Sequence, residues 1–297
     1  MSGLLGEVRN GPARLRELLS GPAPVVAPGA YDALSARLVA AAGFPAVYMT
    51  GFGVTGSLLG RPDVGLLTMT EMVDAARRIT AAVDVPVIAD ADTGYGNALN
   101  IVRTVREYER AGVAAIHLED QVAPKRCGHL AGKQVVPATT MADRVRAAVA
   151  ARTDPDFVLI ARTDARAVEG VDAAIERARL YRDAGADVLF VEALQSAEEI
   201  ETVAEALRGV PLLFNWAEGG RTPPTDLDRL KELGFRIVIF PLSTLLAATR
   251  GIQDVLAKIS TDGTPAAALD GLPGLTDFTR LVGIEEVEEI GRRFGNG

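Results

Sequence analysis

The sequence predicts an eight-stranded (β/α)8 barrel, and three observations support this fold class. A short unit recurs four times, in which a helical segment ends at a glycine and an apolar, β-rich run follows within a few residues. These runs are short and unbroken, as in parallel strands buried on both faces. With the apolar runs between the units, the chain shows eight strands alternating with helical segments. A doubly wound open sheet is the alternative, but no Gly-x-Gly-x-x-Gly turn follows the first strand.

The recurring unit defines four of the eight strands. Glycine just past a helix adopts the left-handed conformation without a Cβ penalty, so each glycine of the unit is a plausible helix terminator. These glycines are Gly43, Gly112, Gly185 and Gly234. The strands that follow them are expected at 46–49, 115–118, 188–191 and 236–240. The other strands are expected at 25–27, 86–89, 157–160 and 211–214.

Amphipathic helical segments separate the predicted strands. The clearest are 13–19, 70–82, 99–110, 141–151 and 172–183. After the eighth strand come a helix at 244–259, a Gly/Pro/Ala-rich stretch at 263–274 and a charged helix near 283–294. We therefore expect one barrel domain over 1–297, with an N-terminal arm and helix at 1–20 and a C-terminal helical extension at 261–297. The extension either caps the barrel or packs on a neighbouring subunit.

The composition narrows the classes of function. The chain has 297 residues, of which 48% are hydrophobic and 24% charged, which is ordinary for a globular protein with a sizeable core. Its net charge of −8 and the lack of a basic tract argue against nucleic-acid binding. No apolar run approaches the roughly 20 residues that span a bilayer, and no signal-peptide segment is evident. A single cysteine excludes an internal disulfide and fits the reducing cytoplasm.

Acidic residues follow the third and fourth predicted strands. In (β/α)8 barrels that are enzymes, the active site lies at this end of the strands. Asp90 and Asp92 alternate along the chain, so both carboxylates can face one centre. Two hard oxygen donors suit Mg²⁺, which keeps several of its waters, and Glu119 would hold a metal-bound water. The alternative is a helix N-cap cluster in which Asp92 caps the helix that begins near Asn97.

The only cysteine, Cys127, lies in a polar segment after the fourth strand. Lys125, Arg126 and His129 stand close to it in the sequence and would lower the pKa of its thiol. A thiol that titrates near neutral pH is a workable general acid or base. An inert Cys127 is the alternative. His117 lies within an apolar run and is expected to be a buried core histidine.

Arg162 and Asn215 are the expected carboxylate-binding residues of this rim, because arginine grips a carboxylate with a planar, bidentate fork. A structural ion pair between Arg162 and Glu192 is the alternative, and the two roles can coexist. A hydroxyl and backbone N–H groups for a second carboxylate or a ketone oxygen are expected from the residues after the second strand, Thr50, Gly51 and Phe52. A plain strand-to-helix turn explains those glycines equally well.

Six motifs at these strand ends resemble one family. They are Tyr-Met-Thr-Gly at 48–51, Ala-Asp-Ala-Asp-Thr-Gly-Tyr-Gly at 89–96, His-Leu-Glu-Asp-Gln at 117–121, Lys-Arg-Cys-Gly-His at 125–129, Ala-Arg-Thr-Asp-Ala at 161–165 and Glu-Gly-Gly-Arg-Thr-Pro at 218–223. Together they resemble the isocitrate lyase/phosphoenolpyruvate mutase superfamily over nearly the whole chain. The motif with the cysteine narrows the resemblance to the carbon–carbon lyase branch, because phosphonate mutases usually carry a different loop without this cysteine.

The resemblance implies a Mg²⁺-dependent reaction of an α-oxyacid through an enolate-like intermediate, with Mn²⁺ as the alternative ion. It implies that Asp90 and Asp92 hold the metal, largely through water, with Asp63 and Glu119 in support. Cys127 would protonate the carbanion left by retro-aldol-type cleavage, on a loop that closes over the substrate and excludes water. The implied catalytic residues are Cys127, Arg162, Glu119, His129 and Lys125. The implied substrate-binding residues are Thr50, Gly51, Phe52, Asp90, Gly128, Arg162, Glu192 and Asn215.

Two departures from the methylisocitrate lyases of this family bear on the substrate. Those enzymes usually have an arginine, for an extra carboxylate, where this chain has Leu246, and Glu-Phe-Gly where it has Glu-Gly-Gly at 218–220. A buried tricarboxylate without that cation would leave a costly unpaired charge. The resemblance implies a lyase that cleaves a 2-hydroxy di- or tricarboxylate of the 2-alkylmalate or methylisocitrate type to a 2-oxo acid such as pyruvate and a carboxylate. Within this range we expect a smaller dicarboxylate, such as a 2-substituted malate or oxaloacetate, rather than methylisocitrate. An oxaloacetate hydrolase or decarboxylase is the alternative, and a phosphonate enzyme a weaker one. The family also implies a homotetramer in which the C-terminal helix packs against a neighbour.

Overall fold

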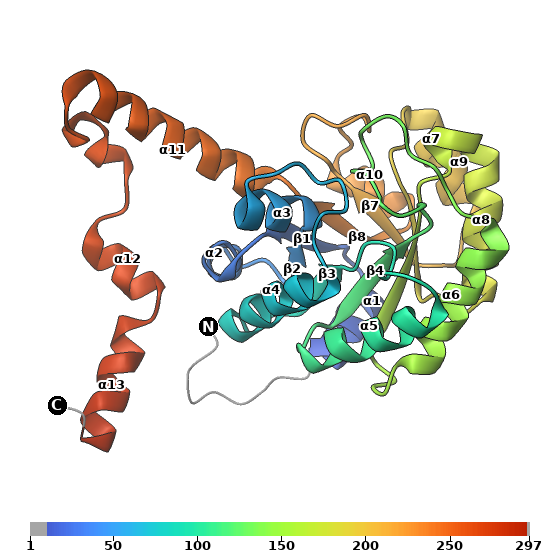
Figure 1. Ribbon diagram of the computed structural model, residues 1–297, viewed down its shortest axis with the longest axis horizontal. Helices are drawn as coiled ribbons and strands as arrows, with labels where there is room; N and C mark the ends of the chain where they lie inside the picture. Colours follow the sequence, from blue (N-terminus) through green and yellow to red (C-terminus); the bar gives the residue numbers. More distant parts are fainter. Residues whose placement is uncertain (1–10, 296–297) are drawn as a thin grey trace.

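Eight parallel strands close into a barrel in the computed structural model, which describes residues 11–295 (Figure 1). Each strand pairs with the next one along the chain, and the eighth pairs with the first. The strands are β1 (Val25–Ala30), β2 (Val47–Met49), β3 (Val87–Asp90), β4 (Ala115–Glu119), β5 (Val158–Thr163), β6 (Val188–Val191), β7 (Leu212–Asn215) and β8 (Phe235–Phe240). The predicted (β/α)8 barrel is confirmed, and the open-sheet alternative is wrong.

Helices connect the strands and surround the barrel (Figure 1). They are α2 (Ala33–Ala41), α3 (Gly51–Leu59), α4 (Met69–Ala82), α5 (Ala98–Arg110), α6 (Ala138–Ala151), α7 (Arg166–Glu169), α8 (Val171–Asp183), α9 (Ala197–Ala206) and α10 (Leu227–Glu232). The four glycines of the recurring unit all have positive φ angles, as helix terminators should. The N-cap of α5 is Asn97, whose side chain accepts from the N–H groups of Leu99 and Asn100, so the alternative of a cap at Asp92 is wrong.

The helix α1 (Gly11–Ser20) closes the end of the barrel where the strands begin. Its Leu15 is fully buried and belongs to the apolar cluster that fills the barrel interior. The neighbouring Arg16 and the more distant Arg152 both bind the carboxylate of Asp187 at 2.8 Å. The N-terminal helix is thus fixed by one apolar contact and one ion-pair cluster. The predicted arm before it, residues 1–10, lies outside the described residues.

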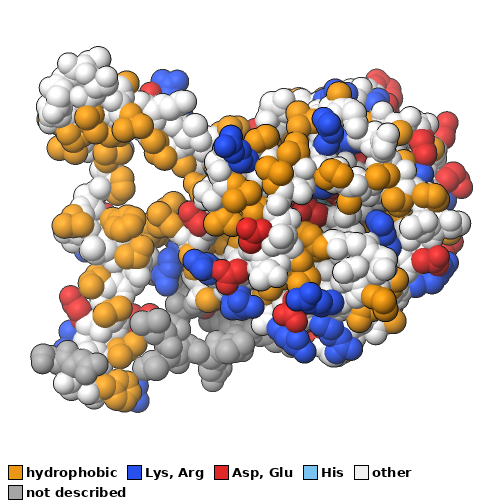
Figure 2. All heavy atoms as spheres, in the orientation of Figure 1, with side chains coloured by type: hydrophobic (Ala, Val, Ile, Leu, Met, Phe, Trp, Pro, Cys, Tyr) orange, Lys and Arg blue, Asp and Glu red, His pale blue; other side chains and the backbone are white. Residues whose placement is uncertain are grey.

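The C-terminal extension leads away from the barrel (Figure 1). It consists of α11 (Ser243–Asp262), a 3-10 helix η1 (Ala266–Gly271), α12 (Leu275–Leu281) and α13 (Ile284–Phe294). None of these elements contains a buried residue, and apolar side chains lie open along them (Figure 2). The large exposed ones are Leu246, Ile252, Leu256, Ile259, Leu269, Leu272, Leu275, Phe278, Val282, Ile284, Val287 and Phe294. The alternative in which the extension caps the barrel is therefore wrong.

None of the helices in residues 11–295 combines the length and apolar character that crossing a membrane requires.

Replacing Leu15 with alanine should destabilise the barrel by about 2–5 kcal/mol, because the truncated side chain leaves a cavity among fully buried neighbours. The midpoint of urea unfolding measures this change. Leu99→Ala is the matched control, since Leu99 is 79% exposed on α5, and its effect should stay within about 0.5 kcal/mol. Equal effects of the two substitutions would contradict the role given to α1.

Candidate active site

A small cavity lies at the end of the barrel where the strands finish. Its lining residues include Thr50, Phe52, Asp63, Asp90, Lys125, Cys127, Gly128, His129, Arg162, Glu192 and Asn215. Most come from the ends of strands and from residues 121–134, which we call the Cys127 loop; Phe52 lies in α3, and Asp63 lies between α3 and α4. The two ends of this loop are joined by a hydrogen bond of 2.8 Å from Val122 N to the Gln134 carbonyl. The cavity measures about 50 Å³, so the loop leaves little room in this closed arrangement.

Lys125 anchors the first half of the Cys127 loop to the acidic residues. Its Nζ lies 2.7 Å from carboxylate oxygens of both Asp63 and Asp92. Burial by itself would lower the pKa of Lys125, but Asp92, Asp90 and Asp63 raise it well above its usual value. Burial raises the pKa of Asp92 to about 6. Burial also opposes ionisation of Asp90, yet His117, Lys125 and Arg162 together keep the pKa of Asp90 below its usual value.

The carboxylates at this rim suit a hard cation that retains water. Among residues 11–295, no three His, Cys, Asp or Glu side chains converge closely enough to form a complete metal site by themselves. Asp63 and Asp90 line the cavity. Glu119 Oε1 is buried without a hydrogen-bond partner, and burial raises the pKa of Glu119 despite the nearby Arg162. An isolated buried oxygen of this kind fits a metal-bound water, and the all-oxygen set fits Mg²⁺.

Arg162 lies at the centre of a second group of carboxylates. Its Nε and Nη2 bind the two oxygens of Asp164 at 2.9 and 3.1 Å, and further oxygens of Glu119 and Glu192 lie at 3.2 and 3.1 Å. The guanidinium also lies 5.1 Å from the centre of the Phe190 ring. Burial alone would lower the pKa of Arg162, but the carboxylates raise it well above its usual value. The expected structural ion pair with Glu192 is therefore present, on a side chain that also lines the cavity.

His129 and Asn215 hold the other face of Glu192. His129 Nε2 lies 3.3 Å from Glu192 Oε1, and Asn215 Nδ2 donates to the same carboxylate at 3.1 Å. The backbone N–H of Arg221 donates to His129 Nδ1 at 3.0 Å. Because Nδ1 accepts this bond, a neutral His129 carries its proton on Nε2, facing Glu192. Burial would raise the pKa of Glu192, but Arg162 and His129 lower it below its usual value, so this carboxyl is ionised.

The environment of Cys127 corrects the expectation of a low thiol pKa. Burial raises the pKa of Cys127, and the carboxylates of Asp63 and Glu192 add to the increase. The charge of Lys125, expected to favour the thiolate, is directed instead to Asp63 and Asp92. Cys127 is therefore a protonated thiol near neutral pH, which suits a proton donor better than a base or a nucleophile.

The residues after β2 combine a structural and a site role. Thr50 is the N-cap of α3 and its hydroxyl oxygen accepts from Gly53 N–H at 3.2 Å, so the strand-to-helix turn is present. Thr50 and Phe52 also line the cavity. Gly51 lies behind it, and a Cβ there would lie 2.9 Å from Asp90 Cγ and closer still to Asp90 Oδ2. A side chain at Gly51 would thus displace the carboxylate of Asp90.

Three predicted site residues do not line the cavity. They are Gly51, Glu119 and Asp92. Glu119 lies against Arg162 instead, and Asp92 lines a neighbouring cavity of about 660 Å³ that Lys125 also lines. His117 is a buried core histidine as predicted: its Nε2 shares a hydrogen bond of 2.8 Å with the Tyr48 hydroxyl, and burial lowers its pKa to about 4.

Sequence reasoning missed two residues that hold the site together. Asp164 binds Arg162, and Lys133 binds both Asp164 and the Gly128 carbonyl. Asp164 stands two residues after Arg162 at a strand end, so the alternation of side chains was a usable signal. Lys133 gave no pattern from which to identify it.

A closed (β/α)8 barrel whose rim gathers buried carboxylates, an arginine and one thiol defines an enzyme of acid–base chemistry. Comparison with known proteins identifies the family to which the chain belongs. A family model described as phosphoenolpyruvate phosphomutase matches residues 15–260. The chain belongs to this family, within the phosphoenolpyruvate mutase/isocitrate lyase superfamily, and is a carbon–carbon lyase.

Three similar proteins illustrate the relationship. 2,3-Dimethylmalate lyase of Eubacterium barkeri is 48% identical over 288 residues, which cover 97% of this chain and 99% of that protein. 2-Methylisocitrate lyase of Aeropyrum pernix is 48% identical over 275 residues, covering 93% and 88%. A solved structure of oxaloacetate acetylhydrolase with the inhibitor 3,3-difluorooxalacetate superposes with a TM-score of 0.91 at 42% identity, covering 96% of this chain and 97% of that one.

The raised pKa of Cys127 predicts a high-pH midpoint for alkylation of this thiol. Because the thiolate is the reacting form, the rate of iodoacetamide labelling should rise with a midpoint above 9.0, the ordinary value for a cysteine thiol. Mass spectrometry of EDTA-treated protein between pH 7 and 11 measures it, and unfolding in urea should return the midpoint toward the ordinary value. A midpoint below 9.0 in the folded protein would show that the cations outweigh burial.

Proposed function

We propose that this enzyme cleaves the C2–C3 bond of a 2-hydroxy dicarboxylate of the 2-alkylmalate type. The products are a 2-oxo acid such as pyruvate and a saturated carboxylate. The observation that carries the proposal is the placement of one protonated thiol, Cys127, in the same closed cavity as Asp90 and the Arg162–Glu192 ion pair. The likeness to 2,3-dimethylmalate lyase over nearly both whole chains supports it.

We further propose that the reaction requires Mg²⁺, with Mn²⁺ as the alternative ion. Asp90 and Asp92 would hold the ion, largely through water, and Asp63 and Glu119 would bind its water ligands. When bound there, the cation would stabilise negative charge on the carboxylate and neighbouring oxygen of the substrate. The isolated Glu119 Oε1 and the cavity-lining Asp63 and Asp90 support this assignment.

The residues of the chain then have distinct tasks. Thr50 and Phe52 seat the half that becomes the 2-oxo acid, and Arg162 with Asn215 orients the other carboxylate. As the hydroxyl of C2 loses its proton and becomes a carbonyl, the C2–C3 bond breaks and its electron pair stays on C3. The Cys127 thiol gives its proton to C3, and the proton released by the hydroxyl restores the thiol. The Cys127 loop excludes water, which would otherwise quench the carbanion.

One position on α11 favours a dicarboxylate over a tricarboxylate substrate. Leu246, where methylisocitrate lyases usually carry an arginine, is 48% exposed on α11 and does not line the cavity. A dicarboxylate therefore suits this chain better than methylisocitrate.

Hydrolysis of oxaloacetate is the second candidate function, supported by the structural likeness to oxaloacetate acetylhydrolase. The same rim would bind oxaloacetate, a dicarboxylate of similar size, and an ionised carboxylate would activate water. A decarboxylase would act on the same compound without needing Cys127.

We also propose that the chain forms a homotetramer in the cytoplasm, with its C-terminal extension packed on a neighbouring subunit. The exposed apolar side chains of α11, α12 and α13 support this arrangement, because monomers rarely leave so many exposed on one segment.

Cys127→Ser should reduce kcat for the best 2-alkylmalate by about 10²–10⁴-fold, because the hydroxyl is a far weaker acid than the thiol. Formation of pyruvate, measured with a coupled dehydrogenase, follows the reaction. EDTA should abolish turnover of the wild-type enzyme, and added Mg²⁺ should restore it. Unchanged turnover in Cys127→Ser would exclude the lyase mechanism, and release of oxalate from oxaloacetate instead of pyruvate from 2-alkylmalates would favour the second candidate.

Leu256→Glu on α11 should lower the molecular mass of the assembly, because a carboxylate buried in an apolar contact is costly. Light scattering coupled to size-exclusion chromatography measures the mass. Lys258→Glu is the control on the same helix, since that position already carries a charge, and its mass should equal that of the wild type. A wild-type protein with the mass of one chain would contradict the tetramer.

A further inference from the structure

The Cys127 loop must open and close during turnover. The cavity under it is too small to admit a dicarboxylate, and Gly128 and His129 cover the Arg162–Glu192 ion pair. The closed arrangement also places the thiol in the cavity. The contacts that favour closure therefore control both the entry of substrate and the position of the proton donor.

Gly128 packs directly against the Arg162–Glu192 ion pair. A Cβ on this residue would lie 2.6 Å from Glu192 Cγ and closer still to Arg162 Nη2. Only a glycine allows the backbone to come so near the ion pair. Gly128 is buried, so its carbonyl needs a partner that is itself buried, because water has little access to it.

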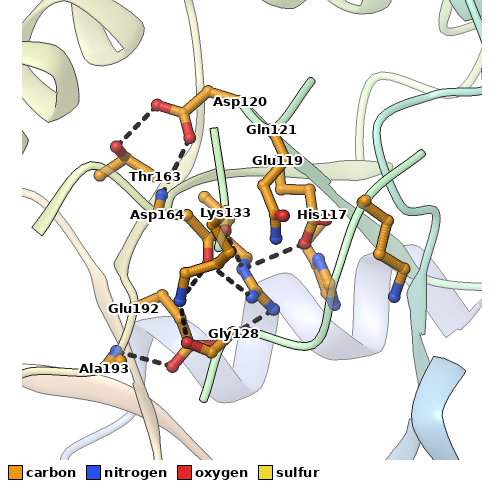
Figure 3. Close-up of polar contacts among 12 residues, drawn as sticks. His117, Glu119, Asp120, Gln121, Gly128, Lys133, Thr163, Asp164, Glu192 and Ala193 are labelled. Carbon is orange, nitrogen blue, oxygen red and sulfur yellow. Dashed lines mark hydrogen bonds and ion pairs between the residues drawn. The ribbon is translucent and has the colours of Figure 1, made fainter. Parts of the chain in front are cut away.

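Lys133 supplies that partner from the far end of the same loop. Its side chain is 2% exposed, and its Nζ donates a hydrogen bond to the Gly128 carbonyl (Figure 3). The same Nζ lies 3.4 Å from Asp164 Oδ1. Asp164 in turn is fixed by its two hydrogen bonds to Arg162 and by a bond of 2.9 Å from its own N–H to Asp120. One ammonium group thus joins the tip of the loop to the end of β5.

Lys133 does not line the cavity, so it does not meet the substrate directly. Burial of a lysine is costly unless the ammonium is paired and hydrogen-bonded. The Lys133 ammonium is paired with Asp164 and hydrogen-bonded to the Gly128 carbonyl at the same time only while Gly128 lies against the rim. If the loop lifts, the ammonium loses the Gly128 carbonyl and the loop loses its link to Asp164.

We propose that Lys133 is a positioning residue that holds the Cys127 loop closed by joining the Gly128 carbonyl to the Asp164–Arg162 pair. Its consequence for catalysis rests on the proposed function, whereas its effect on the loop does not. Loss of Lys133 shifts the loop toward an open state, in which the thiol is accessible and is displaced from the cavity.

The sole cysteine gives a direct measure of opening. Lys133→Met removes the ammonium and keeps a side chain of similar length. The rate of iodoacetamide labelling of Cys127, recorded over a range of pH so that the thiol pKa and the limiting rate are separated, should rise by about fivefold or more in the limiting rate. Arg126→Met is the matched control, because Arg126 is an exposed cation of the same loop, and its limiting rate should stay within about twofold of the wild type.

A second variant tests whether the two contacts act together. Gly128→Ala should also increase labelling, because its Cβ cannot fit against Glu192. If Lys133 acts through Gly128, the double variant should label no faster than about twice the faster single variant. Independent, multiplicative increases would show that Lys133 acts elsewhere and would overturn the proposal.

The remaining outcomes are also decisive. A folded Lys133→Met protein that labels at the wild-type rate overturns the proposal. If this variant does not fold, Lys133→Gln, which keeps a donor for the Gly128 carbonyl but no charge, takes its place. Failure of both to fold would make Lys133 a residue of barrel stability and overturn the proposal too. Faster labelling in a protein that turns over no 2-alkylmalate would leave this inference standing and remove the proposed function.

In an active enzyme, Lys133→Met should lower kcat by about tenfold or more with a smaller change in KM, because the proton donor is misplaced while the carboxylate-binding groups remain. A change in KM alone would indicate a role in binding instead and would contradict positioning.

Discussion

The buried guanidinium of Arg162 is the interaction on which the rest of the rim depends. It binds Glu119 at the end of β4, Asp164 directly after β5 and Glu192 directly after β6, and so joins three neighbouring strand ends. The register of the barrel makes this contact, since Glu119 pairs directly with Arg162 across β4 and β5. Removing one partner from such a buried group leaves an uncompensated charge, which is strongly destabilising. The cavity, the seat of Gly128 and the link to Lys133 all depend on the position of this one side chain.

Most of the fold could be predicted from the sequence because strands buried on both faces leave an unmistakable signal. Continuous apolar runs, four of them preceded by a glycine that ends a helix, predicted all eight strands to within a few residues. The C-terminal extension was less predictable. The helix α12 lies just after a stretch rich in glycine and proline, and the direction of α11 depends on what its apolar side chains pack against. An amphipathic pattern shows that a helix has a partner without indicating which one.

Much of the site could be predicted because parallel strands bring their final residues to one rim, so Asp90, Arg162 and Asn215 converge from separate parts of the chain. The part of the site that could not be predicted is the direction in which the side chains of the Cys127 loop point. Lys125 lies two residues from Cys127 in sequence, yet its ammonium binds Asp63 and Asp92, and burial raises the pKa of the thiol. Neighbours in sequence inside a loop do not share a face, and only the folded distances assign their charges.

The excess of negative charge at the rim supports the proposal that a divalent cation binds before the substrate does. Apart from the buried Asp120–Arg177 pair, whose charges cancel, six buried carboxylates and three buried cations gather there, which gives a formal balance of 3 − 6 = −3 before any proton is taken up. The carboxylates are Asp63, Asp90, Asp92, Glu119, Asp164 and Glu192, and the cations are Lys125, Lys133 and Arg162. A dianionic substrate would be repelled by this surplus at low local dielectric. The proposed Mg²⁺ would reduce this surplus to −3 + 2 = −1. Lys125 and Lys133, which are already counted in that balance, belong to the Cys127 loop, so the surplus is this small only while the loop is closed.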